Sequence, residues 1–387
     1  MVPTAADVVV VGAGPTGLAL ACTLRRAGID VVVVDRATEG TNTSRAAVVH
    51  AGTLETLEDL EVTPRILTAG RRVPVFTVRD RHRVLARLDF STLPTRHPYT
   101  VMIPQSRTEE ILTGRLRELG TEVARPWALT SIAEGPEQVH LVATDRQGQN
   151  ASLTARYVVG ADGMNSAVRE AAGIASTGAR YPQSFVLADV RLQWPLPDDE
   201  VQLFFSSAGL VVVAPLPDGH HRVVATLDDA PEHVTAPLVQ TVLDERGPGG
   251  ATVRDVVWGS RFQVHHRLAD QYRSGHVFLA GDAAHVHSPA GGQGMNTGIQ
   301  DAVCLGDLLA RVVSGGAPED VLDQYEARRR PIAEGVVRLT DRATRMATLH
   351  HPVPRAARNT ALAIAGRVPA LRRRLLMQLS ELSASRA

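Results

Sequence analysis

The residues best suited to chemistry begin with three glycines near the N-terminus, in the pattern Gly12-x-Gly14-x-x-Gly17. In this spacing the first glycine permits a tight turn, the second lets a pyrophosphate approach the backbone, and the third lets a helix pack closely on a strand. Asp35 ends the next apolar run, where a carboxylate can accept hydrogen bonds from ribose hydroxyls. The pattern therefore predicts a dinucleotide site.

The glycines need a strand before them and a helix after them, and the sequence supplies both. Asp7–Val11 is a β-branched run typical of a buried parallel strand, Leu18–Arg26 is an apolar helical stretch, and Val31–Val34 is a second buried strand. Together they predict a complete βαβ unit, which strengthens a motif that would be weak evidence alone.

Two later segments also combine glycine with an acid. Val158–Arg169 contains Asp162 in an Asp-Gly pair, and Gly275–Ala302 contains Asp282 in a Gly-Asp pair. The second segment continues through the loop Gly291–Asn296, which has three glycines and opens a long predicted helix. The nucleotide-binding domain is therefore expected to be built from discontinuous pieces of the chain.

Between these segments the pattern changes to short strands divided by turn chemistry, at Trp194–Pro197 and Pro215–Gly219. Such a run predicts an antiparallel meander, unlike the βαβ unit, and we expect a second domain there. The predicted strands are Phe185–Leu192, Val201–Phe205, Leu210–Ala214 and Arg222–Leu227.

Two helices are predicted outside the meander. One covers residues 104–119, with Glu109, Glu110 and Arg117 outward and its apolar residues inward. The other is the basic, amphipathic run 371–379, for which packing of one face on the body of the protein is favoured over a role at a membrane surface.

Composition excludes several classes of function. The 387 residues include 41 arginines and no lysine, balanced by 41 acidic residues, which excludes Schiff-base catalysis and gives no sign of nucleic acid or a membrane as partner. The two cysteines, Cys22 and Cys304, provide no disulfide framework and are expected to be packing residues. The sequence has no signal peptide and no run long enough to span a bilayer, so we expect a cytoplasmic protein.

The sequence has two close pairs of histidines, His285 with His287 and His220 with His221. His285 and His287 would point the same way in an extended segment, but no cluster of acids or cysteines accompanies them, and we expect no metal. His220 and His221 fall in a Pro/Gly-rich turn and are expected to be solvent-exposed.

The glycine motif, the Asp-Gly segment and the Gly-Asp segment together resemble the class A flavoprotein monooxygenases. This is the family of para-hydroxybenzoate hydroxylase and of the aromatic-polyketide hydroxylases of antibiotic biosynthesis. The resemblance runs from about residue 7 to about residue 340, and Ser44-Arg45-Ala46 and Pro104–Glu109 also match it. The resemblance implies an α/β fold: a Rossmann-type FAD-binding domain with an inserted antiparallel-sheet substrate domain and C-terminal helices. The implied boundaries are 1–75, 100–180 and 275–340 for the FAD-binding domain, 76–99 and 181–274 for the substrate-binding sheet domain, and 341–387 for the C-terminal helical segment.

The resemblance also implies roles for single residues. Arg45 and Gln105 would lie near the flavin and the centre of the cofactor, Asp162 would help to handle FAD and NAD(P)H, and Asp282 would bond the ribityl hydroxyls. Arg45 and Pro289 are the candidates for a direct part in catalysis, although the flavin would supply most of the chemistry. The residues expected to bind the cofactor are Gly12, Ala13, Gly14, Pro15, Thr16, Gly17, Asp35, Arg36, Arg45, Gln105, Leu129, Asp162, Asp282, Pro289, Gly292, Gly294, Met295 and Asn296.

The loop Gly291–Asn296 also suits a flavin on physical grounds. Its backbone N–H groups can face the N1–C2=O edge of a flavin, and the N-terminus of the following helix favours the negative charge of a reduced flavin. The substrate is then expected between the flavin and one face of the meander sheet. The candidate pocket residues are Val201, Leu203 and Phe205, which share one face by strand alternation, Val211 and Val213, which also share a face, and Arg222.

The implied reaction uses NADPH or NADH to reduce FAD, and O2 then forms a flavin C4a-hydroperoxide that hydroxylates an aromatic, phenolic or polyketide-like small molecule. Because only one complete glycine motif occurs, the nicotinamide cofactor is expected to bind transiently. Three alternatives stay open: Baeyer–Villiger or epoxidising oxygen transfer, a FAD oxidoreductase that transfers no oxygen, and a non-catalytic FAD-bound partner protein. The sequence also leaves open the exact substrate, the catalytic base and whether the chain forms a homo-oligomer.

Overall fold

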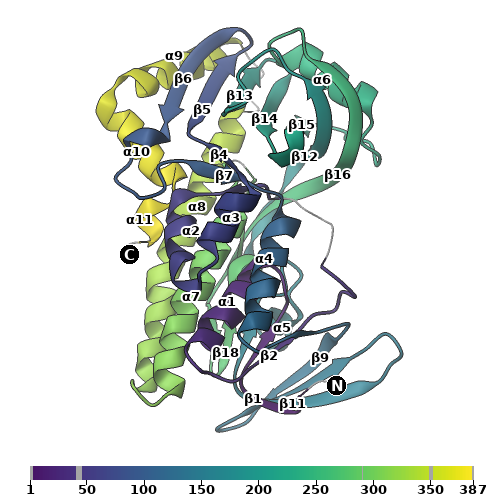
Figure 1. Ribbon diagram of the computed structural model, residues 1–387, viewed down its shortest axis with the longest axis vertical. Helices are drawn as coiled ribbons and strands as arrows, with labels where there is room; N and C mark the ends of the chain where they lie inside the picture. The colour runs from purple at the N-terminus through teal and green to yellow at the C-terminus, as the bar shows by residue number, and fades with distance from the viewer. Residues whose placement is uncertain (1–2, 41–45, 290, 348–351, 386–387) are drawn as a thin grey trace.

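The computed structural model describes residues 3–40, 46–289, 291–347 and 352–385. Two large sheets dominate, one in the lower half and one in the upper half of Figure 1, with long helices along one side. Two long strands, β12 (Ser176–Gln193) and β16 (Thr252–Ala269), run from one half into the other. The predicted α/β fold with an inserted antiparallel sheet is confirmed.

The lower sheet is built around five parallel strands. From edge to edge its strands are β17 (Arg273–Ser274), β18 (Val277–Leu279), β11 (Asn150–Gly160), β1 (Ala5–Val11), β2 (Val31–Val34) and β8 (Val123–Ala124), with β10 (Val139–Thr144) and β9 (Ala128–Glu134) extending from β11 as an antiparallel arm. β1 lies between β11 and β2, so Val8, Val9 and Val10 are fully buried. β1, helix α1 (Pro15–Arg26) and β2 form the predicted βαβ unit.

The upper sheet is antiparallel except at one pair of strands, β13 and β5. In order, its strands are β19 (His285–Val286), β16, β12, β15 (His221–Leu227), β14 (Gly209–Pro215), β13 (Glu200–Ser206), β5 (Val75–Asp80) and β6 (Arg83–Asp89). The meander strands predicted from turn chemistry are thus confirmed as β12 to β15. Helix α6 (Ala236–Arg246) covers the outer face of this sheet, where Val239, Val242 and Leu243 enter its core.

A three-stranded sheet and a layer of helices join the two halves. The small sheet is β3 (Val48–Val49), β7 (Thr100–Met102) and β4 (Arg71–Val73). The helices are α2 (Ala51–Thr56), α3 (Thr63–Ala69), α4 (Gln105–Glu118), α5 (Ala167–Ala171), α7 (Gly294–Val313) and α8 (Asp323–Ala347), with short 3-10 turns η1 (Glu58–Leu60), η2 (Phe90–Thr92), η3 (Pro217–Gly219), η4 (Gly281–Ala283) and η5 (Glu319–Leu322). In the part of the chain described, no helix is long and apolar enough to cross a membrane.

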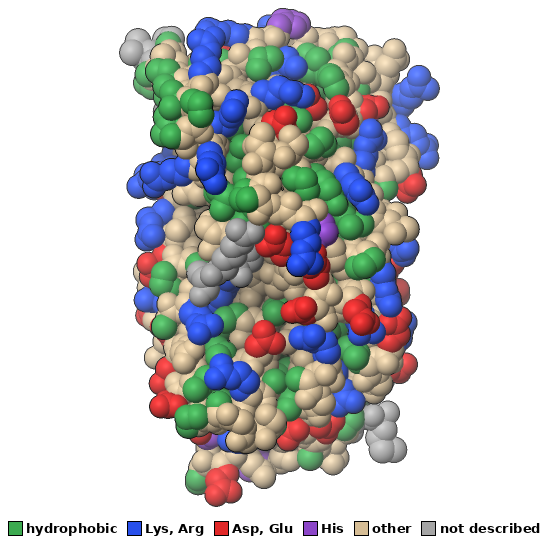
Figure 2. All heavy atoms as spheres, turned by 60° about the vertical axis from the view of Figure 1, so that its left-hand side comes forward, with side chains coloured by type: hydrophobic (Ala, Val, Ile, Leu, Met, Phe, Trp, Pro, Cys, Tyr) green, Lys and Arg blue, Asp and Glu red, His purple; other side chains and the backbone are tan. Residues whose placement is uncertain are grey.

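The C-terminal helices are α9 (Pro352–Arg367), α10 (Pro369–Leu379) and α11 (Leu382–Ser385), and they turn back onto the body of the protein. Leu376 and Leu382 are almost fully buried, while Arg373 and Arg374 are exposed. The amphipathic run therefore packs one face on the body, as predicted. On the face seen in Figure 2, basic and acidic side chains are interspersed with apolar ones.

Two expectations about exposure are wrong. Glu109, expected on the outer face of its helix, is buried because the chain after β2 passes over it, with Gly40 near its carboxylate. His221, expected in an exposed turn, is buried because it is the first residue of β15, where it packs beside Trp194 and bonds Asp198.

Candidate active site

The three glycines of the N-terminal motif have three distinct surroundings. A side chain on Gly12, at φ 105°, would collide with the backbone of Ala161, and one on Gly17 would collide with the carbonyl oxygen of Gly12. A Cβ added to Gly14, in contrast, meets no atom within 4 Å. The first and third glycines thus close the turn and seat α1, while the second leaves open space above the helix N-terminus, which is what a pyrophosphate requires.

Asp35 lies beside this loop and orders it. Its Oδ2 accepts a hydrogen bond from the Ala13 N–H at 2.7 Å, and its Oδ1 accepts bonds from the Ala37 N–H at 2.7 Å and from Arg125 at 3.1 Å. Arg125 also donates to the Glu39 carbonyl at 2.9 Å. Sequence reasoning missed Arg125, since it lies far from the motif along the chain and no local pattern marks it.

The start of α4 lies close to the same end of the lower sheet. Gln105 accepts a hydrogen bond from the Ala46 N–H at 3.3 Å and donates to Glu109 at 2.8 Å. Burial raises the pKa of the Glu109 carboxyl, although the bond from Gln105 opposes the shift. Arg45, predicted to lie near the flavin, is outside the described residues.

The Asp-Gly and Gly-Asp segments meet in space. Arg169 joins them, donating to the Ala283 carbonyl at 2.9 Å and to the Met164 carbonyl at 3.0 Å. Asp162 accepts the Ala167 N–H through Oδ2 at 2.7 Å, whereas its buried Oδ1 has no partner among the described residues. The side chain of Asp282, on η4, is exposed.

Thr16 brings the glycine motif against these later segments. A Cβ on Gly281 or on Gly298 would come too close to the Thr16 side chain, so α1, η4 and α7 approach one another only because both positions are glycine. Helix α1, near the N-terminus, therefore forms one surface with η4 and α7, which lie more than 250 residues later in the sequence.

The glycine-rich loop before α7 is fixed by Asn296 and His50. Asn296 donates to the carbonyls of Val48 and Gly292, both at 2.9 Å, and accepts the His50 N–H at 2.8 Å. The His50 ring bonds the Gly291 carbonyl at 2.9 Å, and burial lowers its pKa to about 4, so this histidine is neutral. Gly291 and Gly292 both have positive φ, as the tight loop needs.

Behind the loop, a buried ion-pair network anchors α7 and η4. Asp301 binds His285 at 2.5 Å and Arg329 at 2.6 Å, and it also accepts the Gly281 N–H at 3.3 Å. Burial alone would raise the pKa of Asp301, but the interactions with His285 and Arg329 outweigh it and lower the pKa. The ring of His287 is stacked parallel to that of His285, and no group of three potential metal ligands occurs in the described residues.

The remaining expected cofactor residues line the same region or its edge. Pro15 and Gly17 are buried at the start of α1, and Leu129 is half-buried on β9. Arg36 is exposed after β2, and Pro289, Gly294 and Met295 are half-buried around the start of α7.

The inner face of the upper sheet is turned toward this surface. Register places Val201, Leu203 and Phe205 on this face, and Val201 shares a cluster with Ala47 and Val48, next to the glycine-rich loop. The other members of the face that are apolar and only half-buried are Val212, Val224, Trp258 and Phe262.

Val211 and Val213 do not lie on the same face of the sheet as Val201 and Leu203. Val211 pairs with Phe204 and Val213 with Gln202, so both point to the outer face of the sheet. There they are fully buried in the core under α6. Strand alternation correctly placed Val211 and Val213 on one face of β14, but it could not predict which face of β14 lies beside which face of β13.

Arg222 is the buried cation that the strands of the inner face supply among the described residues, and it is already paired. Its Nε and Nη2 bind the two oxygens of Asp189 at 2.7 and 2.8 Å, and its Nη1 donates to the Ala46 carbonyl at 2.9 Å. Its guanidinium also lies 5.7 Å from the centre of the Trp258 ring. The residue therefore ties the sheet to the cofactor half instead of presenting a free charge.

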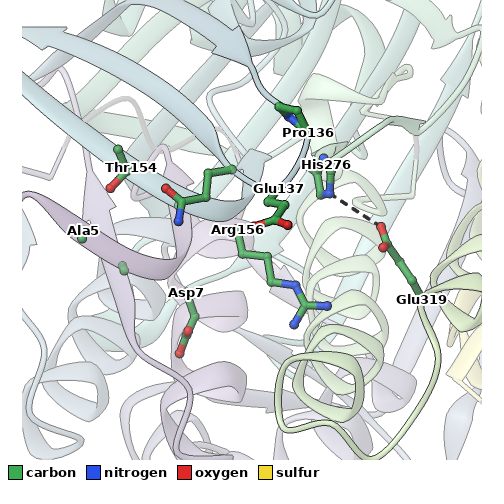
Figure 3. A pocket seen from close by; sticks show the side chains of 11 residues that line it. Ala5, Asp7, Pro136, Glu137, Thr154, Arg156, His276 and Glu319 are labelled. Carbon is green, nitrogen blue, oxygen red and sulfur yellow. Dashed lines mark ion pairs between the residues drawn. The ribbon is translucent and has the colours of Figure 1, made fainter.

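A cavity of about 500 Å³ lies elsewhere, at the opposite end of the lower sheet (Figure 3). Its lining includes Asp7, Arg156, His276 and Glu319, with His276 and Glu319 3.9 Å apart. It opens at the start of β1, and the glycine motif lies beyond the other end of that strand, so we do not assign the site to it.

The open space at Gly14, the orphan oxygen of Asp162, exposed Asp282 and the loop before α7 fit an extended dinucleotide with a ring system at its far end. Fold and site together define a flavoprotein of the Rossmann type.

Comparison with known proteins agrees with this class. Residues 5–340 match the FAD binding domain family. The chain is 41% identical over 364 residues to 12-dehydrotetracycline 5-monooxygenase/anhydrotetracycline 6-monooxygenase of Streptomyces rimosus, covering 90% of this chain and 71% of that protein. It is 38% identical over 351 residues to the uncharacterized aromatic compound monooxygenase YhjG of Bacillus subtilis, covering 88% and 68%.

Solved structures are similar over nearly the whole chain. OxyS anhydrotetracycline hydroxylase from Streptomyces rimosus has a TM-score of 0.82 at 38% identity, with 98% of this chain and 76% of that chain covered. p-Nitrophenol 4-monooxygenase PnpA from Pseudomonas putida DLL-E4 has a TM-score of 0.88 at 27% identity, with 98% and 99% covered. The chain belongs to the family of FAD-dependent aromatic monooxygenases and is a FAD-dependent enzyme of this type.

Proposed function

We propose that FAD lies across the surface formed by the glycine motif, η4 and the start of α7, with its ring system at Gly291–Asn296. Asp35 and Arg125 would order the adenosine end, and Asp282 would accept hydrogen bonds from the ribityl chain. The support is the arrangement of open backbone at Gly14 and of the loop that Asn296 fixes.

FAD, when bound, supplies the redox chemistry with NAD(P)H and O2. The protein itself positions the cofactor and the substrate and shields them from water. The N-terminus of the 20-residue helix α7 favours negative charge on the ring system that faces it. The inner face of the upper sheet, joined to the loop through Arg222 and Ala46, would hold the substrate against that ring and keep water away.

We further propose that the substrate is a neutral aromatic compound of several fused rings, hydroxylated on a phenolic ring. One observation carries this: the inner face offers half-buried apolar side chains over four strands, while its cation Arg222 is neutralised by Asp189. Such a face gives a carboxylated single ring no free charge to bind, but it matches a wide apolar surface. The Streptomyces rimosus relative named 12-dehydrotetracycline 5-monooxygenase/anhydrotetracycline 6-monooxygenase fits this substrate class.

The test is NAD(P)H oxidation with a panel of neutral polycyclic phenols and of phenol carboxylates, followed by mass analysis of products formed under labelled O2. Stimulated oxidation with one labelled oxygen in a polycyclic product is the expected result. Ring expansion to a lactone would indicate Baeyer–Villiger insertion. NAD(P)H consumption without label in the product would indicate a non-oxygenating oxidoreductase, and stimulation by carboxylated phenols alone would contradict the substrate class.

A further inference from the structure

The C-terminal strap, which we define as Leu376–Ala384, is bound to the back of the proposed flavin loop. The Gln378 carbonyl accepts a hydrogen bond from the Gln293 side chain at 3.3 Å. The Ser380 carbonyl accepts the Gly52 N–H at 2.9 Å, and the Ala384 carbonyl accepts Arg329 at 3.2 Å.

Gly52 makes the close approach of the strap possible. A Cβ at this position would lie 2.5 Å from the carbonyl oxygen of Glu381 and 2.7 Å from its carbonyl carbon. These are backbone atoms, which cannot move aside as the end of a side chain can. Helix α2 therefore packs directly against the backbone of the C-terminal strap at Gly52.

Glu381 is the most deeply placed polar residue of the strap. It is 3% exposed and has a φ of 57°, a conformation that residues other than glycine seldom adopt without being held by their surroundings. Its Oε2 accepts a hydrogen bond from Gln300 at 2.7 Å, and its Oε1 lies 3.3 Å from the Thr297 hydroxyl. Both partners lie in the first two turns of α7.

The contacts around Glu381 give its carboxyl group no ion-pair partner among the described residues. The Thr297 hydroxyl also lies 3.0 Å from the Gln293 carbonyl, which can only accept. The Thr297 hydroxyl has one proton, which it shares between the Gln293 carbonyl and Oε1 of Glu381. Arg329, the nearby cation, is engaged by Asp301. Burial raises the pKa of Glu381 to about 8, in agreement with this arrangement.

We propose that the C-terminal strap is part of the FAD site, and that Glu381, as a neutral carboxylic acid, is a positioning residue that holds the start of α7 in the geometry FAD needs. The proposal rests on the proposed placement of the flavin ring at Gly291–Asn296. Glu381 acts through Thr297, whose hydroxyl bonds Gln293 at the beginning of the helix.

Ionisation of Glu381 would disturb this arrangement. The charged groups that face it are Asp301 of α7 and Arg329 of α8, and α2 presents only the uncharged Gly52 and Thr53. Above a pH of about 8 a second buried negative charge would arise near Asp301. The affinity for FAD should then decline in the wild type, whereas a glutamine at position 381 cannot ionise and should avoid this decline.

The experiment compares the FAD dissociation constant and the midpoint potential of bound FAD in four full-length proteins, well below and well above pH 8. They are wild type, Glu381→Gln, Glu381→Ala and the control Ser383→Ala, a change at an exposed residue of the same strap. Glu381→Ala should weaken FAD binding about tenfold at both pH values, since Gln300 and Thr297 lose their partner. Glu381→Gln should match wild type below pH 8 and bind FAD more tightly than wild type above it.

Wild-type FAD binding by Glu381→Ala, or a parallel alkaline loss in Glu381→Gln and wild type, would overturn the proposal. Asp282→Ala separates this failure from failure of the flavin placement. If Asp282→Ala loses FAD while Glu381→Ala keeps it, only the role of the strap is wrong. If Asp282→Ala keeps FAD, the placement itself is wrong.

Discussion

In the proposed site, the nucleotide-binding half and the upper sheet would recognise their ligands with different parts of the chain. In the lower half the proposed site is made largely of backbone, at the open turn of Gly14, the loop at Gly291 and Gly292, and the N-termini of α1 and α7, with a few carboxylates such as Asp282 beside it. In the upper half it is made of side chains on one face of a sheet. A backbone site suits a cofactor that never changes, while a side-chain face can be altered without disturbing the fold.

Replacement of glycines in the lower half should give the largest effects. Gly17→Ala should strongly destabilise the protein, because its Cβ collides with the carbonyl oxygen of Gly12. Gly14→Ala should leave the unfolding temperature of the apoprotein unchanged, because its Cβ meets no atom within 4 Å, yet weaken FAD binding by roughly 100-fold by occupying the space of the pyrophosphate. Thermal unfolding of the apoproteins and titration with FAD measure both. Equal loss of stability in the two variants would contradict the separate roles of the glycines.

Arg222→Met tests the contact between the halves. Removing one partner of this buried pair leaves Asp189 without compensation, and we expect a loss of about 3–5 kcal/mol in the free energy of unfolding. The double variant with Asp189→Asn should recover much of that loss. Denaturant unfolding measures both. If the single variant is as stable as wild type, Arg222 is not a structural link, and a direct role toward the substrate becomes the better explanation.

Val211 and Val212 are a matched pair on opposite faces of one strand. Val211→Ala should lower the free energy of unfolding by about 2 kcal/mol through a core cavity and leave KM for the aromatic substrate unchanged. Val212→Ala, at a half-buried position, should raise KM several-fold with a smaller loss of stability. Steady-state kinetics and denaturant unfolding distinguish the two. The reverse result would place the substrate on the other face.

The smallest expected effect is a dependence of stability on pH that arises from Glu381, in the nucleotide-binding half. The pKa of Glu381 is raised to about 8 in the folded protein, above its ordinary value, so its stabilising contribution is complete below the ordinary pKa and is lost as pH rises through about 8. Glu381→Gln should therefore flatten the decline of the unfolding temperature between the ordinary carboxyl pKa and a pH of about 8. Wild type and variant declining in parallel would assign the decline to other groups.

The sequence predicts local features of this molecule well. The βαβ unit, Asp35 and the meander strands follow from patterns within a few dozen residues, and the structure has these elements. The partners that complete the site do not follow from such patterns. Asn296 binds the His50 N–H across 246 positions, and Asp301 reaches His285 only because η4 and α7 fold back on each other.

The substrate face shows a second kind of limit. Alternation assigns the residues of one strand to two faces, but the pairing of Leu203 with Val212 and of Phe204 with Val211 decides which residues of neighbouring strands lie together. Trp258 and Phe262 were missed for the same reason, since β16 joins the sheet beside β12 from far along the chain.

The most direct test of the account is the FAD content of Asp282→Ala after purification, measured by visible absorption against protein concentration. A matched control is Asp229→Ala, an exposed carboxylate in a turn of the substrate sheet. Asp282→Ala should retain about a tenth or less of the wild-type FAD, as expected when charge-assisted hydrogen bonds to the ribityl chain are lost, and Asp229→Ala should retain all of it. Full FAD content in Asp282→Ala would contradict the proposed position of the cofactor between the two halves.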